Sequence, residues 1–193
     1  LLFAAAGWYC LSGLLPKGQR YWAWLGVLCQ PSMYGRTIIF SYHEPFLTPR
    51  PIAESLCLLA IGLLARGRYA LAIASLACAG VFHPLQAIAA ALVIWPWLVM
   101  QDHRWLHAAW GAIPILLLAF AGIAPFDGLL RQVDAAWLAE LRQSTGQLFV
   151  TGWPVSDYKL IAFDAFILLL AQRTARDGLG TWCMAALIGL SMG

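Results

Sequence analysis

His43-Glu44-Pro45-Phe46-Leu47-Thr48-Pro49-Arg50-Pro51-Ile52-Ala53-Glu54 is the stretch that decides the fold, because it places four ionisable side chains and three prolines between long apolar runs. Three prolines within seven positions exclude a continuous helix and predict extended backbone as far as Pro51. Pro51 then suits the first turn of a new helix, and Glu54 falls inside that turn, where the helix dipole favours a carboxylate. Arg50 lies four residues before Glu54, so the two can pair if Arg50 joins the helix.

The composition of the whole chain sets the class of protein. Of 193 residues, 62% are apolar and 11% charged, and the mean hydropathy is +0.74. Soluble domains carry about a quarter charged residues. We therefore predict an all-α fold: one polytopic transmembrane bundle of seven to eight helices over residues 1–193. Neither end resembles a natural terminus, which predicts a fragment of a longer protein, and the basic residues form no single patch that predicts a nucleic-acid partner.

The apolar segments differ in length. Two of them, 52–65 and 69–82, have only about 14 residues each, whereas about 20 are needed to cross a bilayer. They are joined by Arg66-Gly67-Arg68, so we predict a tight hairpin. Pro31 is expected to kink the second segment. The expected segments are 1–15, 21–42, 52–65, 69–82, 85–100, 105–124 and 158–171, with an eighth beginning near 179.

Residues 126–157 break the apolar pattern. Leu130, Val133, Trp137 and Leu141 recur at helical spacing with charged residues on the other faces, which predicts an amphipathic helix lying in the membrane interface. Ser156 or Asp157 is expected to cap the helix that follows.

The distribution of arginine and lysine predicts the orientation. If the segments alternate across the membrane, most basic residues of the short loops lie on one side, which the positive-inside rule places in the cytoplasm. Residues 43–50, His83 and residues 126–157 then share the outer side. The basic residues of the cytoplasmic group are Lys17, Arg20, Arg66, Arg68, Arg104, Arg173 and Arg176.

Familiar motifs of soluble enzymes do not occur. The sequence has no GxSxG, Walker loop, HExxH or GxGxxG. Its five cysteines fall inside predicted segments, with no CxxC and no histidine at metal spacing, so they are interpreted as small apolar core residues rather than zinc ligands. No cofactor is predicted, although a divalent metal ion at an outer carboxylate stays open.

Three residues are candidates for catalysis. Glu44, beside His43, could act as a general base or bind a metal, and the alternative is a carboxylate that only faces water. His83 precedes Pro84 at a helix end, and the alternative is a histidine that only completes that end. Because a hairpin of two equal arms returns His83 to the depth of Ile52, we predict that one outer cavity collects the following side chains: His43, Glu44, Arg50, Glu54 and His83.

Other polar residues lie deeper or further along the chain. Asp164 is inside an apolar segment, where an acid is costly, so it is predicted to face the bundle and meet a partner. The available partners are Arg36, Lys159 and His83. Trp153, in the outer loop, could stack on a sugar or anchor the loop among lipid headgroups.

The run Glu44–Glu54, the short helix to Arg66-Gly67-Arg68 and the short helix to His83-Pro84-Leu85 give a layout similar to bacterial GT-C glycosyltransferases of the protein-mannosyltransferase and aminoarabinose-transferase kind. The resemblance covers roughly residues 20–175, by architecture more than by motif. The outer interfacial helix, followed by Trp153 and Asp157, fits the same layout. In that family the leading catalytic acid lies in the first outer loop, and no such loop precedes Glu44 here.

The resemblance implies a bacterial inner-membrane glycosyltransferase. It would bind a polyprenyl-phosphate-sugar donor between helices and use an outer acid as base or metal ligand. Arg50 would meet the donor phosphate, since guanidinium suits that group. Glu54, Trp153 and Asp157 are the other substrate-binding candidates. Two alternatives stay open: a transporter with a path lined by Pro31, Asp164 and His83, and a non-catalytic membrane scaffold.

Overall fold

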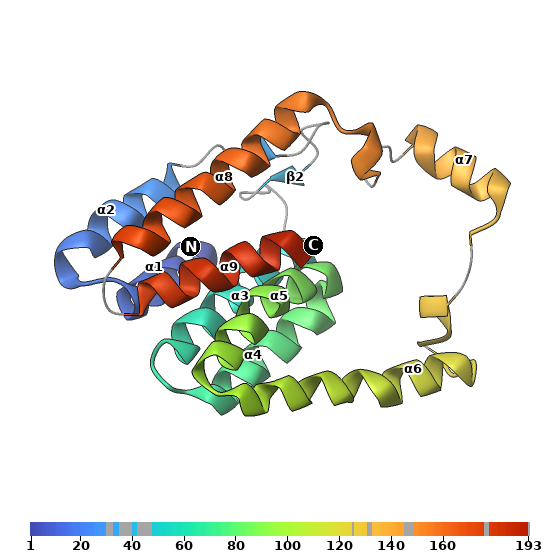
Figure 1. Cartoon of the computed structure of the whole chain (residues 1–193), viewed down its shortest axis with the longest axis horizontal. Coiled ribbons are helices and arrows are strands. Elements are labelled where there is room, and N and C mark those ends of the chain that lie inside the picture. Colours follow the sequence, from blue (N-terminus) through green and yellow to red (C-terminus); the bar gives the residue numbers. More distant parts are fainter. Residues whose placement is uncertain are drawn as a thin grey trace.

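The structure is a computed structural model, and it describes residues 1–29, 33–34, 40–41, 48–124, 126–130, 133–144, 149–175 and 178–192. The fold is helical apart from one antiparallel pair of two-residue strands, β1 (Met33–Tyr34) and β2 (Phe40–Ser41), so the all-α prediction is confirmed (Figure 1). The helices are α1 (Leu2–Leu14), α2 (Lys17–Leu28), α3 (Pro49–Leu64), α4 (Tyr69–Phe82), α5 (Pro84–Gln101), the 3-10 helix η1 (His103–Gly111), α6 (Ala112–Phe120), η2 (Phe126–Leu130), α7 (Ala135–Ser144), η4 (Val150–Gly152), α8 (Val155–Thr174) and α9 (Leu179–Met192).

Five helices form the bundle. Helix α3 packs against α1, α4 and α5, and α5 also packs against α4 and α9. Helix α2 lies on α1, and α8 lies on α9. The chain from η1 through α6 and α7 arcs away from this bundle before α8 returns to it (Figure 1). The bundle thus joins elements from both ends of the sequence.

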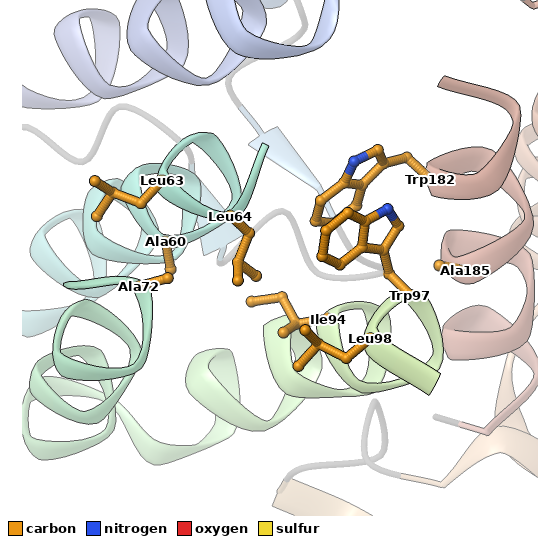
Figure 2. Close-up of a cluster of buried hydrophobic side chains, with 9 residues drawn as sticks. All are labelled: Ala60, Leu63, Leu64, Ala72, Ile94, Trp97, Leu98, Trp182 and Ala185. Carbon is orange, nitrogen blue, oxygen red and sulfur yellow. The ribbon is translucent and has the colours of Figure 1, made fainter. Parts of the chain in front are cut away.

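The main core lies where α3, α4, α5 and α9 meet. Trp97 of α5 and Trp182 of α9 stack with ring centroids 4.4 Å apart and an interplanar angle of 16°. Stacked aromatic pairs add to the free energy gained from burial alone. Figure 2 shows the indole pair beside the aliphatic members of the core, which comprises Ala60, Leu63, Leu64, Ala72, Ile94, Trp97, Leu98, Trp182 and Ala185.

Glycines allow the closest helix contacts. A Cβ added to Gly62 of α3 would lie 2.8 Å from Cys10 Cα in α1. A Cβ added to Gly189 of α9 would lie 2.8 Å from the carbonyl oxygen of Leu92 in α5. Small residues that let backbones approach closely are characteristic of helix packing in membranes.

The predicted hairpin between α3 and α4 is confirmed. Gly67 has φ of 71°, the left-handed conformation that glycine adopts without steric cost. The amide of Arg68 donates to Leu63 O at 2.9 Å, and the amide of Gly67 donates to Leu64 O at 2.8 Å. This is a Schellman motif, which closes the end of α3 and reverses the chain. Helix α4 has the predicted bounds.

The predicted start of α3 was wrong. The helix begins at Pro49, with Thr48 as its N-cap, so Pro49, Arg50 and Pro51 are all helical. The first four amides of a helix have no intrahelical acceptor, and prolines in the first turn therefore break no hydrogen bond. Glu54 consequently lies in the second turn, and the first turn contains no acid. The helix dipole at the first turn therefore does not explain why a carboxylate stands at position 54.

Two further segments differ from expectation. The segment predicted at 21–42 is not one helix: α2 ends at Leu28, and β1 and β2 follow. Pro31 itself lies outside the described residues. The segment predicted at 105–124 begins as the 3-10 helix η1 and becomes α-helical only from Ala112 to Phe120.

One described helix, α5, is long and apolar enough to cross a membrane, and core helices of soluble proteins meet the same criterion. Helices α1, α4 and α9 are apolar but shorter. A bundle of seven to eight spans therefore stays a prediction.

Candidate functional site

A cavity of about 360 Å³ lies between α1, α2, α3 and α5. This volume falls in the range of roughly 300–1,000 Å³ that is typical of small-molecule sites. Its walls are apolar except at two side chains, Glu54 of α3 and Gln86 of α5. An apolar cavity with a few convergent polar groups is the common form of a ligand site.

The two polar side chains are hydrogen-bonded to each other. Gln86 Nε2 donates to Glu54 Oε1 at 2.9 Å. The backbone of Gln86 makes two further contacts: its amide donates to His83 Nδ1 at 3.4 Å, and its carbonyl accepts from Cys57 Sγ at 3.7 Å. Gln86 is thus the residue that joins the start of α5 to the second turn of α3.

The orientation of the Gln86 amide follows from this contact. A carboxylate only accepts, so Glu54 holds the NH₂ group and turns Oε1 away. Among the described residues, the buried Oε1 atom has no hydrogen-bond partner. Leaving a buried acceptor unsatisfied costs about 1–3 kcal/mol. This oxygen has almost no accessible surface, so the Gln86–Glu54 contact holds the amide at a cost in free energy.

The cavity has a polar end and an apolar end. Gly62 lies against Cys10, and Gly13 lies against Ala65, so α1 and α3 run side by side in the same direction. Of the lining residues, Glu54 is therefore at the end near the start of both helices, and Ile61 is two turns further along. At 1.5 Å per residue the two are about 10 Å apart.

The cavity reaches the surface of the bundle on the α5 side. Ala89 lines the cavity and is exposed. The neighbouring side chains Leu85 and Ile88 are 71% and 55% exposed. The exposed surface of α5 around this lining residue is thus apolar.

The predicted catalytic residues can be compared with this cavity only in part. Glu44, His43 and Arg36 lie outside the described residues. His83 is the N-cap of α5, where its side chain accepts from Gln86, and it does not line the cavity. Arg50 is half-buried in the first turn of α3, one turn before Glu54. Through Gln86, the structure brings His83 and Glu54 to the same end of the bundle.

The candidates near α8 lie elsewhere. The ring of Trp153 is 6.3 Å from that of Tyr158, and Asp157 accepts from Ser156 Oγ at 3.3 Å. Neither Trp153 nor Asp157 lines the cavity. The predicted cap was wrong, because Pro154 is the N-cap of α8 and no side chain caps it.

The predicted orientation of Asp164 was also wrong. Its side chain is exposed, and α8 contains no buried residue. The physical reason is that α8 packs chiefly against α9 among the described elements. An acid at most positions of such a helix points outward.

Gln86 is the site residue that the sequence interpretation missed. It is uncharged and stands inside an apolar run, so no charge or motif marked it. The sequence feature that could have marked it is its position as a single polar side chain in an apolar run: between His83 and Gln101 no other residue has a side-chain amide or a charge.

Within the described part of the chain, no group of three His, Cys, Asp or Glu side chains could hold a metal ion. All five cysteines are free, and Cys10, Cys57 and Cys183 are buried as predicted, whereas Cys29 and Cys78 are exposed. Comparison of the chain with known protein families, with characterised proteins and with solved structures finds no match.

Proposed function

We propose that this chain belongs to a membrane glycosyltransferase-like protein of the bacterial inner membrane, which uses a lipid-linked sugar donor at the outer face. The observation that carries the proposal is the cavity between α1, α2, α3 and α5. Its apolar walls and single polar end, at Glu54 and Gln86, match the division of an amphiphilic substrate into an apolar body and a polar group.

The amount of exposed surface supports a membrane environment. The chain has an accessible surface of 13066 Å², whereas a compact soluble protein of 21.2 kDa exposes about 9,000 Å². Many large apolar side chains contribute to this surface. On α8 alone, Leu160, Phe163 and Phe166 are each about 60% exposed. In water, faces of this kind would associate, and in lipid they need no cover.

The proposed division of roles follows the polar end of the cavity. Arg50, one turn nearer the start of α3 than Glu54, would bind the donor phosphate through its guanidinium. Glu44, next to His43, would serve as the general base or as a metal ligand. Trp153 and Asp157 would contact the sugar from the α8 side.

The geometry favours this function over a transporter. The transporter hypothesis requires a polar path through the bundle with Asp164 in the interior. The side chain of Asp164 is instead exposed on α8. The described residues lining the cavity also become entirely apolar away from Glu54 and Gln86.

The test is turnover of a lipid-linked sugar by the protein reconstituted in liposomes. Polyprenyl-phosphoryl-mannose and polyprenyl-phosphoryl-glucose are supplied without an acceptor, so that water takes the sugar, and release of polyprenyl phosphate and free sugar is measured by mass spectrometry. We expect Glu44→Gln to lower release at least about 100-fold, as loss of a general base does, and Arg50→Ala to raise KM for the donor.

Matched controls are Glu140→Gln and Arg68→Ala, both at exposed positions away from the cavity. They should leave release unchanged. Wild-type rates in both Glu44→Gln and Arg50→Ala would contradict the proposal.

A further inference from the structure

We infer that the cavity between α1, α2, α3 and α5 holds about ten carbons of the lipid chain of the donor, and that Gly7 is the residue of α1 that keeps this space open. The inference rests on the proposed function for the identity of the lipid. It adds a specificity-determining residue, which touches the chain rather than the reacting atoms.

The first argument is that the packing of the helices does not explain a glycine at position 7. Gly7 lies in the interior of α1, where glycine is less favourable than alanine. Among the described residues three glycines are buried: Gly7, Gly62 and Gly189. A Cβ on Gly62 or on Gly189 would meet the backbone of a neighbouring helix at 2.8 Å, whereas a Cβ on Gly7 would meet nothing within 4 Å. Gly7 is thus a buried glycine beside open space, and that space is the cavity that it lines.

The second argument is the size of the cavity. Along α1 its lining runs from Phe3 to Leu11, which is about 12 Å of helix. An extended chain advances about 1.3 Å per carbon, so this length holds roughly ten carbons. The volume of about 360 Å³ gives a similar number, since at about 30 Å³ for a water-sized group it has room for roughly twelve. Length and volume therefore both fit one chain.

The third argument is the chemistry of the wall. Away from Glu54 and Gln86 the described lining residues are apolar, among them Leu11, Leu58 and Ile61. Such a wall cannot replace the hydrogen bonds that a polar group loses on leaving water. If the cavity stays empty, its lining forfeits van der Waals contacts, and a hydrocarbon chain restores them without any polar partner. The polar end then leaves the headgroup of the same lipid on the side of Arg50.

The experiment uses the protein in liposomes with a ten-carbon isoprenoid monophosphate that carries a diazirine at the far end of its chain. Adducts are mapped by mass spectrometry to α1 and α3, which line the cavity, and to α8, which does not. A single site saturates and a lipid-exposed surface does not, so we expect excess polyprenyl phosphate to lower labelling of α1 and α3 at least about tenfold and to leave labelling of α8 unchanged. The same excess of phosphatidylglycerol should lower neither.

The variant Gly7→Leu places four carbons in the cavity, about a third of the available room. We expect labelling of α1 and α3 to fall at least about tenfold, because the remaining space is too small for the chain. The midpoint of unfolding in denaturant should equal or exceed that of the wild type, since the new side chain fills a void and leucine is the better helix former. Gly26→Leu is the matched control: Gly26 is exposed in α2, does not line the cavity and also has nothing within 4 Å of an added Cβ. It should keep the wild-type labelling.

Wild-type labelling in Gly7→Leu would overturn the inference, because the chain would then not use this space. A lower midpoint of unfolding in Gly7→Ala would also overturn it, because the space beside Gly7 would then not be open. Gly7→Ala adds only the Cβ, so this second test stands even if Gly7→Leu fails to fold. In the wild type, labelling of α1 and α3 that polyprenyl phosphate does not suppress, or that phosphatidylglycerol suppresses equally, would reject the donor chain as the occupant.

The labelling reports binding and the release of polyprenyl phosphate reports turnover, so the two proposals fail separately. Saturable labelling without turnover would reject the transferase and keep a site for a lipid chain. Turnover with labelling that does not saturate would reject the inference and keep the transferase.

Discussion

At the scale of single residues, Arg66 connects two helices through several contacts of one guanidinium group. Its Nη1 donates to Gly62 O at 2.6 Å, and its Nη2 donates to Tyr9 O at 2.8 Å and to Ser12 Oγ at 2.5 Å. The guanidinium also lies 3.8 Å from the centroid of the Tyr9 ring. One cation thus fastens the end of α3 to α1.

We expect Arg66→Met to lower the free energy of unfolding by about 2–3 kcal/mol, because charged hydrogen bonds are lost and Tyr9 O loses a partner. Denaturant titration in detergent micelles, followed by tryptophan fluorescence, measures the change. Arg68→Met is the matched control in the same turn, since Arg68 is exposed, and it should change stability by less than about 0.5 kcal/mol. Equal losses in both variants would show that Arg66 acts only through net charge.

Two of the residues that charge or a helix end marked in the sequence lie at the start of α3 and α5. Glu54 was named as a substrate-binding candidate and lines the cavity, and His83 was placed at a helix end, where it caps α5. The sequence did not mark Gln86, because a hydrogen bond between two helices depends on which of their faces meet. A single stretch of sequence does not contain that information. Asp164 was misplaced for the same reason, since nothing in its own segment reveals that α8 has one neighbour.

At the scale of elements, the contact between α5 and α9 depends on Gly189. Its Cα stands so close to α5 that a Cβ would meet Leu92 O at 2.8 Å and Leu92 C at 3.0 Å. Both are backbone atoms and cannot rotate away as a side chain would.

Gly189→Ala should therefore push α9 away from α5 and disturb the stacked Trp97–Trp182 pair. We expect a loss of stability of about 1–3 kcal/mol from overpacking, with a change in tryptophan fluorescence. Gly26→Ala is the control, because Gly26 in α2 has nothing within 4 Å of its added Cβ. There the better helix propensity of alanine should be neutral or stabilising by up to about 1 kcal/mol. A stabilised Gly189→Ala protein would refute the close contact.

Elements were predictable when their signals were local. Arg66-Gly67-Arg68 contains the glycine that a Schellman motif requires, and the hairpin followed. The prolines were a local signal too, but the position of Pro49 and Pro51 in the helix decided their effect: in the first turn they begin α3 instead of delaying it. The prediction of one helix over residues 21–42 was wrong because apolar composition does not distinguish one long helix from α2 followed by β1 and β2.

At the scale of the whole molecule, the predicted orientation in the membrane decides on which side each end of the helices lies. The start of α3 and α5, with Glu54 and Gln86, belongs to the side assigned as outer. The α3–α4 turn, with Arg68, belongs to the side assigned as cytoplasmic. Helix α7 in the loop 126–157 belongs to the outer side.

The orientation can be tested with single cysteines at Glu140 and Arg68, both exposed positions, in a protein whose five native cysteines are replaced. We expect an impermeant maleimide to label Glu140→Cys in intact cells and to label Arg68→Cys only after permeabilisation. The reverse pattern would mean that the orientation is inverted, and labelling of both in intact cells would refute a hairpin that ends on the cytoplasmic side.

The stack of Trp97 on Trp182 has a consequence for the order of events on the ribosome. The two indoles are about 85 positions apart, and such distant pairs close late. While α6, α7 and α8 are being synthesised, the face of α5 that carries Trp97 has no α9 to cover it. The nascent chain therefore passes through a stage in which the face of α5 that carries Trp97 is uncovered and can pair with a wrong partner.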